Sequence, residues 1–508
     1  METSALAARF QDEERNKSRK QSIKESRWAL AWCLYSFFIC IMWGFDGLAG
    51  SIIISIATFR EHFGNLYRGQ YVVDANWQLG WLAASLGGMV LGGWAAGLSI
   101  DRVGRRPVLL AAYLISIGGI FGQFFAETPA EFLAGKLLTG IPLGIFTTVA
   151  PTYASEMAPL NIRGSVTAGM NFAIVLGQLI GYGVMRQASL YPDDRQFRVV
   201  IAAQWGFVGA ALVVLPFFPE SPYWLVAHGL ENKARQTLEK LYDRDHDVEG
   251  HLAAIRGSLF KDVRDGRSQG RITECFDKDN LKRTLVGSGM FLVQNASGAI
   301  WVIGYMSYFL QLAGMSASQS FDATVGLCGM MVVGNVFGWF CVDWFGRRAT
   351  ALWGALVLSL ALLLIGILAM VSAPGILWGV VGMMAVWSFV YQATLGAAAW
   401  PITTENATSR LRVPTQAVAT MTNGLSSAAC AMFLPYAINP DQGNLGGRIA
   451  FIFGGALVVG AVFIFLMVPE TKGRTYTEID ELWSRGVPPR KFKGMALITA
   501  STEPSSLR

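Results

Sequence analysis

The sequence predicts an all-α membrane protein of twelve transmembrane helices in two six-helix halves. Of its 508 residues 53% are hydrophobic and 15% are charged, and long apolar runs recur along most of the chain. Soluble domains carry roughly 25% charged residues, and a helix needs about 20 apolar residues to cross a bilayer. The expected spans are 28–56, 80–99, 107–126, 132–151, 166–185, 200–218, 285–309, 322–342, 350–371, 376–397, 415–436 and 448–467.

The segments outside the spans divide the chain further. Residues 1–27 are polar, and the apolar run after them is too long for a signal-peptide core, so we expect a retained first helix. The two halves are expected at 28–218 and 285–468. Between them the polar linker 219–284 has acidic and basic residues at i,i+4 spacing, which favours short helices rather than an enzyme domain. The tail 469–508 follows the second half.

The distribution of basic residues predicts the orientation of the spans. Lysine and arginine accumulate in the cytoplasmic connections of membrane proteins. We therefore place both termini in the cytosol. The net charge of +6 requires no nucleic-acid partner, because the basic connections are short turns between spans. With this orientation, the outer connections hold a small share of the 41 basic residues, namely Arg60, Arg68, Arg186, Arg195, Arg198 and Arg448.

The residues that build most catalytic and metal sites are scattered. Of the six cysteines, five lie in expected spans and Cys275 lies in the linker, with no CxxC pair or Cys/His cluster. The four histidines all fall in connections. Because the sequence also has no nucleophile–base set and no phosphate-binding loop, we expect neither an enzyme nor a bound metal or other cofactor.

Three charged motifs occur twice, in the same order and at nearly the same separation. Internal repeats of this kind are typical of secondary transporters, which hold their substrate near the membrane midplane between the two halves. The repeat therefore predicts a transporter with one substrate site. The pairs are GLSIDRVGRRP with CVDWFGRRAT, Glu156 and Arg163 with Glu405 and Arg412, and Pro219-Glu220 with Pro469-Glu470.

The repeated charges predict a gate on the cytosolic side. Arginines at the end of one helix can pair with glutamates at the end of another, holding this side closed in one state and separating in the other. The alternative is that the arginines only follow the positive-inside rule, but their repeated acidic neighbours favour pairing. The candidate gating residues are Asp101, Arg105, Arg106, Glu156, Arg163, Glu220, Asp343, Arg347, Arg348, Glu405, Arg412 and Glu470.

These motifs, together with PESPYWL (219–225) and PETKGRTYTEID (469–480), resemble the sugar porter family of the major facilitator superfamily over roughly residues 30–483. Three further stretches are similar to fungal maltose/α-glucoside permeases, namely ENATSRLR, PYAINP and GYMSYFLQLAGM. The resemblance implies a transporter that works by alternating access, with a disaccharide or α-glucoside favoured as its substrate.

Asp46 is the only charged residue between Trp28 and Phe59. An ionisable residue near the bilayer centre costs about 2.5–3.5 kcal/mol on insertion scales, which makes it a candidate for function. Lys136 is the other lone charge deep in a span of the first half. The resemblance implies that Asp46 couples transport to protons, with Lys136 where the family usually has an arginine partner. The alternative is a static ion pair that stabilises this half.

A sugar site should combine amide side chains, which both donate and accept hydrogen bonds, with an aromatic ring that covers the apolar face of the sugar. The resemblance implies such a site, although Ile300 and Gly304 replace polar family residues and the tenth span lacks the family's prolines. The alternatives are helix–helix hydrogen bonds for the polar residues and a core or lipid-facing position for the tryptophan. The candidates are Asn171, Gln178, Gln294, Asn295, Tyr305, Trp400 and Asn423.

These departures disfavour a plain glucose transporter. We expect proton-coupled uptake of a sugar by a monomer in the plasma membrane. The alternatives are passive transport, transport of another polyhydroxylated compound such as quinate, inositol or a specialised metabolite, and a sugar sensor that does not transport. Such sensors usually carry a long cytosolic tail, whereas about forty residues follow Pro469.

Overall fold

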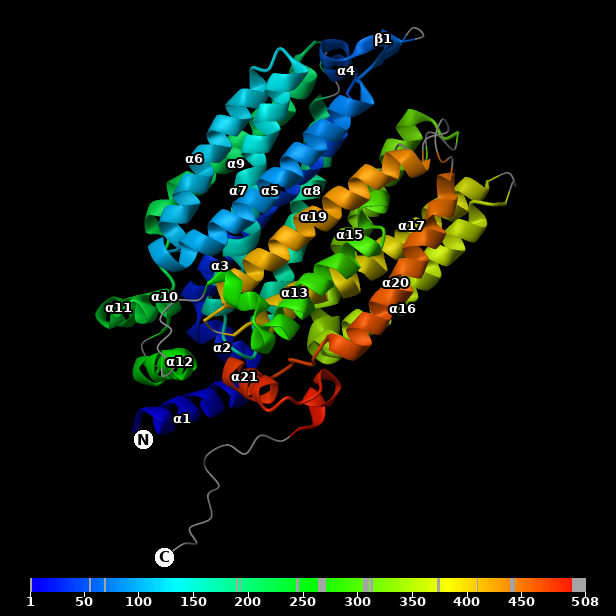
Figure 1. Cartoon of the computed structure of the whole chain (residues 1–508). Helices are drawn as coiled ribbons and strands as arrows, with labels where there is room; N and C mark the ends of the chain where they lie inside the picture. The colour runs from blue at the N-terminus through cyan, green and yellow to red at the C-terminus, as the bar shows by residue number, and fades with distance from the viewer. Residues whose placement is uncertain are drawn as a thin grey trace, which may run out of the picture.

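Long helices that run side by side make up most of the computed structural model (Figure 1). Within the described ranges, eleven helices are long and apolar enough to cross a membrane. The expected seventh span, 285–309, corresponds to α13 (Lys278–Ala296) and a π-helical segment at Ile300–Gly304, and residues 305–309 lie outside the described ranges. The structure describes residues 2–53, 56–67, 70–188, 191, 193–243, 246–263, 271–304, 310, 314–371, 375–408, 410–438, 443 and 445–495.

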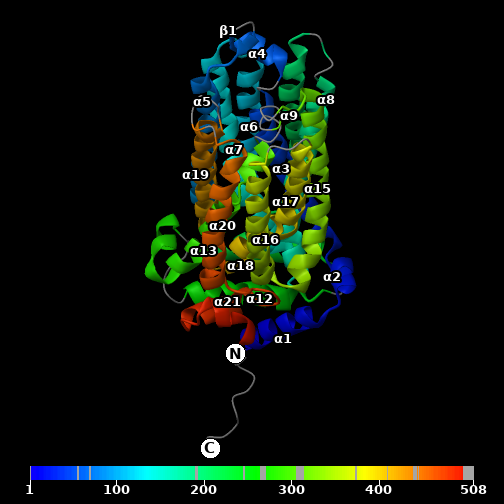
Figure 2. The same ribbon diagram turned by 90° about the vertical axis from the view of Figure 1, so that its right-hand side faces the viewer.

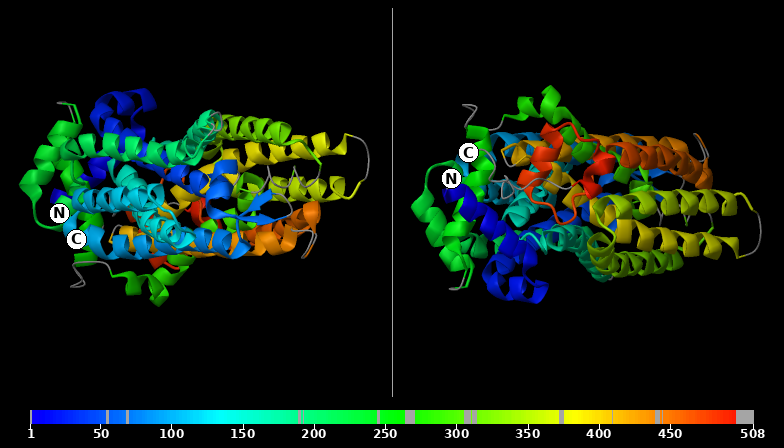
Figure 3. Two further views of the ribbon diagram at one scale, coloured as in Figure 1. Left: turned by 90° about the horizontal axis from the view of Figure 1, so that it is seen from above. Right: turned by 90° about the horizontal axis from the view of Figure 1, so that it is seen from below.

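The long helices fall into two neighbouring groups, blue to teal and green to orange in the views from above and below (Figure 3). The first group is α3 (Arg27–Ile52), α5 (Ala75–Val103), α6 (Arg105–Phe124), α7 (Pro129–Met157), α8 (Arg163–Ala188) and α9 (Arg195–Val214). The second is α13, α15 (Ala317–Trp344), α16 (Arg347–Leu368), α17 (Ile376–Tyr391), α18 (Ala397–Asn406), α19 (Arg412–Ile438) and α20 (Ile449–Met467).

The first and the last α-helix of the described chain lie at one end of the bundle, which we call the tail end (Figure 2). It carries α1 (Glu2–Asn16), α2 (Arg19–Glu25), α10 (Pro222–Ala227), α11 (Glu231–Leu241), α12 (Val248–Val263) and α21 (Tyr476–Ser484), with 3₁₀ turns η2 (Leu215–Phe217), η3 (Ile272–Phe276) and η7 (Pro489–Gly494). Helices α10 to α12 lie in the expected linker and are short, at 6, 11 and 16 residues.

The opposite end, which we call the hairpin end, departs locally from an all-helical fold. After α4 (Ala57–Phe63), strands β1 (Asn65–Tyr67) and β2 (Gln70–Val72) pair antiparallel, with Leu66 opposite Tyr71. The 3₁₀ turn η6 (Gly446–Arg448) precedes α20.

Two π-helical segments, η4 (Ile300–Gly304) and η5 (Gln392–Gly396), interrupt the second half, and η5 divides the tenth span between α17 and α18.

Small residues allow the helices to approach closely. A Cβ added to Gly140 of α7 would lie 3.0 Å from the Cα of Gly88 in α5. Interfaces of membrane helices are often built this way, because apolar side chains gain little from leaving a lipid environment. Across the two halves, α5 packs along α19 and α8 packs along α15. The halves therefore meet along the length of these helices.

Glycines with positive φ make the sharp turns between paired helices at the tail end. Gly104 (φ 97°) joins α5 to α6, and Gly346 (φ 92°) joins α15 to α16. L-residues with a side chain rarely adopt this conformation. A Cβ at Gly104 would also lie 2.6 Å from a carboxylate oxygen of Glu220. Each glycine therefore lets a carboxylate reach the start of the following helix.

Candidate functional site

Two glutamates of the first half hold the turn between α5 and α6. Glu220 accepts hydrogen bonds from the main-chain N–H groups of Arg105 at 3.0 Å and Arg106 at 3.2 Å, where the helix dipole favours an anion. The buried guanidinium of Arg105 forms an ion pair with Glu156 at 2.9 Å. Ser221 Oγ donates to the other oxygen of Glu156 at 2.5 Å. Asp101 lies 4.0 Å from the same guanidinium.

The second half repeats the main-chain contacts of this turn, but its arginine binds both oxygens of the glutamate. Glu470 accepts from the main-chain N–H groups of Arg347 at 2.9 Å and Arg348 at 3.2 Å. Arg347 donates to both oxygens of Glu405, at 3.0 and 2.8 Å, and Thr471 Oγ1 donates to Glu405 at 2.6 Å. These buried arginines and glutamates depend on one another, because removal of one partner would leave an uncompensated charge.

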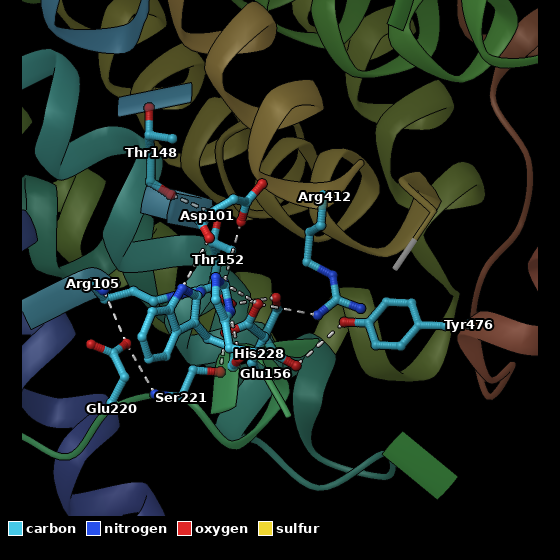
Figure 4. A network of polar contacts seen from close by, with 12 residues as sticks. Asp101, Arg105, Thr148, Thr152, Glu156, Glu220, Ser221, His228, Arg412 and Tyr476 are labelled. Carbon is cyan, nitrogen blue, oxygen red and sulfur yellow. Dashed lines mark hydrogen bonds and ion pairs between the residues drawn. The ribbon is translucent and has the colours of Figure 1, made fainter. Parts of the chain in front are cut away.

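Tyr476 and Arg412 of the second half contact the first half at this network (Figure 4). Arg412, whose side chain is 1% exposed, lies 3.6 Å from Glu156. The guanidinium groups of Arg412 and Arg163 lie 4.0 and 4.3 Å from the centre of the Tyr476 ring. The Tyr476 hydroxyl donates to the main-chain oxygen of Ser155 at 3.3 Å. The tail end is therefore closed across the two halves.

The network is not symmetric between the halves. Arg412 reaches a carboxylate of the other half, whereas among the described residues Arg163 has no carboxylate oxygen within 4.0 Å. Near Arg163, Ser165 Oγ donates instead to Asp343 of the second half. The predicted gating residues are thus brought together, but the contacts that cross between the halves differ from those that repeat within them.

Asp46 and Lys136 face one another across the interface of α3 and α7. Lys136 is 5% exposed, and its Nζ lies 5.6 Å from the centre of the Phe132 ring. Each of the two charges is the main electrostatic partner of the other. In the described part of the chain, no nitrogen–oxygen distance of 4.0 Å or less joins them. The lysine therefore attracts the carboxylate electrostatically without forming a direct ion pair with it.

Amide side chains from two helices meet at Gln392, in the π-helical segment η5, and an amide from a third helix bonds the main chain of this segment. Its Oε1 accepts from Asn171 Nδ2 of α8 and, at 3.1 Å, from Asn335 Nδ2 of α15. Gln294 Nε2 of α13 donates to the main-chain oxygen of Leu395 in the same segment at 3.1 Å. Since α8 belongs to the first half, Gln392 connects the halves within the bundle.

A second polar cluster joins α13 to α19. Asn295 Nδ2 donates to Asn423 Oδ1 at 3.0 Å and to Ser426 Oγ at 2.6 Å, and Ser427 Oγ donates to Asn295 Oδ1 at 3.1 Å.

Unlike these amides, Gln178 has a buried side-chain oxygen without a donor from the described residues. An unsatisfied buried acceptor is costly, so Gln178 is suited to a ligand hydroxyl.

The predicted aromatic contact, Trp400, is 3% exposed. Its ring meets the edge of Phe291 of α13, with the centroids 5.2 Å apart at 78°. It lies directly after the π-helical segment, where the family's prolines are missing. The other predicted aromatic residue, Tyr305, lies outside the described residues.

Similarity to known proteins identifies the kind of molecule. A family model described as "Sugar (and other) transporter" matches residues 32–483. The chain belongs to this family of transporters. The predicted sugar porter resemblance is therefore confirmed, and the protein is a transporter rather than an enzyme.

Two curated relatives of this sugar transporter cover nearly all of it. A general alpha-glucoside permease of Saccharomyces cerevisiae is 28% identical over 94% of the chain and 79% of the permease. The MFS transporter fmqE of Aspergillus fumigatus is 29% identical over 98% of the chain and 95% of the relative. The similarity to yeast α-glucoside permeases that the motifs predict is thus found along the whole chain.

The fold matches that of solved transporters. The proton:xylose symporter XylE bound to 6-bromo-6-deoxy-D-glucose superposes with a TM-score of 0.77 at 23% identity, covering 90% of this chain and 100% of that one. An inward-open XylE from E. coli gives a TM-score of 0.67. The helical major facilitator fold is therefore confirmed.

Two residues of this sugar transporter escaped the sequence-based prediction. Gln392 is a lone amide in the apolar run VWSFVYQATLG, and that isolation was the available signal. Tyr476 lies in the motif PETKGRTYTEID, but nothing in the motif indicates that its ring lies between two arginines. The missing prolines gave no indication of a π-helical segment, which is a feature often found at functional sites.

Proposed function

We propose that this transporter takes up a sugar together with a proton by alternating access, as a monomer in the plasma membrane with its tail end in the cytosol. Proton coupling is proposed from the pair Asp46 and Lys136, two charges that interact inside the first half without a direct ion pair. Charges inside membrane spans are costly and usually functional.

In the proposed cycle, Asp46 takes up a proton when the hairpin end is open. Its attraction to Lys136 then falls, because only the ionised carboxylate is drawn to the ammonium. Sugar binding allows the halves to close at the hairpin end and open at the tail end. The carboxylate then releases its proton and regains its interaction with Lys136, and the emptied transporter returns.

The amides around Gln392 and Asn295 support a polyhydroxylated substrate. Each amide can donate and accept at once, and Gln178, seven residues after Asn171 on α8, has a side-chain oxygen without a donor from the described residues. The yeast relative is named for α-glucosides, which favours a disaccharide or α-glucoside. The similar identity to fmqE, which is not named for a sugar, keeps another polyhydroxylated compound as the second candidate.

Transport by purified protein in proteoliposomes tests this proposal. Counterflow with maltose, glucose, inositol and quinate identifies the substrate, and uptake driven by a pH gradient tests the coupling. We expect Asp46→Asn to retain counterflow and to lose accumulation. Glu61→Gln, which neutralises an exposed carboxylate at the hairpin end, is the matched control and should behave like the unmodified chain. Normal accumulation by Asp46→Asn would contradict the coupling.

A further inference from the structure

The N-terminal segment crosses the tail end of the bundle. We call α1 and α2 together the N-terminal strap. Figures 1 and 2 show α1 lying beneath α12 and close to α21, while α2 lies at the outer edge of the bundle. Helix α1 packs directly on α12. The strap is therefore placed across the same end at which the gate contacts close.

The first anchor of the strap is Phe10, which is 4% exposed. Its ring stacks on His251 with the centroids 5.0 Å apart and meets His246 edge-on at 5.6 Å. His246 stacks on Tyr242 at 4.1 Å, and the Tyr242 hydroxyl donates to the main-chain oxygen of Met157, the last residue of α7. Burial of Phe10 thus ties α1 to the end of a transmembrane helix.

The second anchor is a set of hydrogen bonds to the connection after α7. The Leu160 N–H donates to Glu14 at 3.2 Å. Asn161 Nδ2 donates to the main-chain oxygen of Lys17 at 3.1 Å and to Ser22 Oγ at 2.7 Å. These two residues stand directly before Arg163 at the start of α8. The strap therefore holds the connection that positions one arginine of the gate.

The third anchor reaches the other half of the transporter. Arg19 forms an ion pair with Asp343 at 3.1 Å. Asp343, at the end of α15, also accepts the hydrogen bond from Ser165 of the first half. Separation of the halves at the tail end would carry Asp343 away from the other two anchors. The strap cannot keep all three anchors when this end opens.

A pocket links the strap to the gate directly. Its walls include Phe10 and Glu14 of the strap and Glu156, Arg163 and Tyr476 of the gate. Residues of the strap and residues that hold the two halves together thus line the same space. Release of α1 would expose this space, with its buried arginine, to water.

We propose that the N-terminal strap is an autoinhibitory element that holds the tail end closed, and that its release favours the tail-open state. This inference rests on alternating access, which is part of the proposed function, but on neither the substrate nor the proton coupling. The strap adds contacts to the closed state alone, so it sets how often the tail end opens.

The separation of the two halves at the tail end measures this effect. Spin labels at Val103→Cys and Phe345→Cys would occupy exposed, equivalent positions at the ends of α5 and α15. The distance between them is recorded by electron spin resonance on the full chain, without substrate or gradient. A chain without the two new cysteines measures background labelling of the native cysteines.

We expect Phe10→Ala to raise the ratio of open to closed molecules by roughly 10-fold or more, because a large buried side chain is lost. Arg19→Gln should raise it roughly 2- to 5-fold, as expected for a partly exposed ion pair. Arg9→Ala is the matched control, since Arg9 lies on α1 with its side chain 78% exposed, and it should leave the ratio unchanged.

Two results distinguish failure of the proposed autoinhibition by the strap from failure of the proposed transport cycle. If Tyr476→Ala separates the labels but neither Phe10→Ala nor Arg19→Gln does, the autoinhibitory role is wrong and alternating access stands. If no variant and no substrate ever separates the labels, the proposed cycle itself fails. Should Phe10→Ala not fold, Arg19→Gln decides the question alone, because its exposed ion pair is not needed for the core.

Discussion

Replacement of Tyr476 tests how the two halves are held together at the tail end. Its contacts across the halves are the hydrogen bond to Ser155 at 3.3 Å and the position of Arg163 4.3 Å above its ring. The contact with Arg412 lies within one half and does not break on opening. Tyr476→Phe removes the hydrogen bond, worth about 0.5–1.5 kcal/mol. Tyr476→Ala also removes a cation–π contact worth about 0.5–2 kcal/mol.

The closed state should therefore lose about 1 kcal/mol in Tyr476→Phe and about 2 kcal/mol in Tyr476→Ala. At about 1.4 kcal/mol for a factor of ten, the ratio of open to closed molecules rises roughly 5-fold and 30-fold, respectively. The spin-label pair at residues 103 and 345 measures both. Tyr436→Phe, an exposed tyrosine at the far end of α19, is the control. An unchanged ratio in Tyr476→Ala would refute the gate assignment.

Three further outcomes follow from the structure. Lys136→Gln should abolish accumulation driven by a pH gradient while counterflow persists, and Lys136→Arg should restore it; loss of both activities alike would contradict a coupling role. Gln392→Ala should raise the half-saturating substrate concentration roughly 10-fold, measured by counterflow, because Asn171, a predicted substrate contact, loses the buried acceptor that orients it. Docking of the strap should weaken as pH falls, measured by hydrogen exchange of α1. Burial lowers the pKa of His246 to about 4 and of His251 to about 3, from 6.5. With the strap released, these two histidines of the linker therefore bind more protons between pH 6.5 and 4, and docking loses up to about 1.4 kcal/mol per pH unit for each histidine. Burial raises the pKa of Glu14, so protonation of Glu14 favours docking in its own titration range and opposes the effect of the histidines. Hydrogen-exchange protection of α1 that increased on acidification would contradict the prediction.

The positions of the spans could be predicted because the membrane imposes a simple rule. A helix must satisfy every backbone polar group internally across the apolar layer, so long apolar runs define the helices. The run from Trp28 became α3 with its single aspartate. The repeated motifs likewise placed Glu156 and Glu405 beside arginines, because helix ends joined by short turns bring such residues together.

What could not be predicted depends on contacts between distant helices. The sequence indicated where Trp400 lies along its helix but not that its ring meets Phe291. Gln392 accepts from α8 and α15 out of the π-helical segment η5, and no residue pattern marks such a segment. The sequence of the strap predicts only a polar tail, because its apolar positions are few, whereas Phe10 is buried in the structure where α1 packs on α12.

The division of the charges explains how the tail end can be both closed and able to open. The strongest ion pairs, Arg105 with Glu156 and Arg347 with Glu405, each lie within one half. They need not break when the halves separate, so the cost of exposing unpaired buried charges is avoided. The contacts that cross between the halves at this end include an ion pair at 3.6 Å, the Tyr476 hydroxyl, the Tyr476 ring beside Arg163, and single bonds to Asp343. Each half can thus move as a rigid unit, and the balance between states rests on a few contacts that a strap, a substrate or a proton can shift.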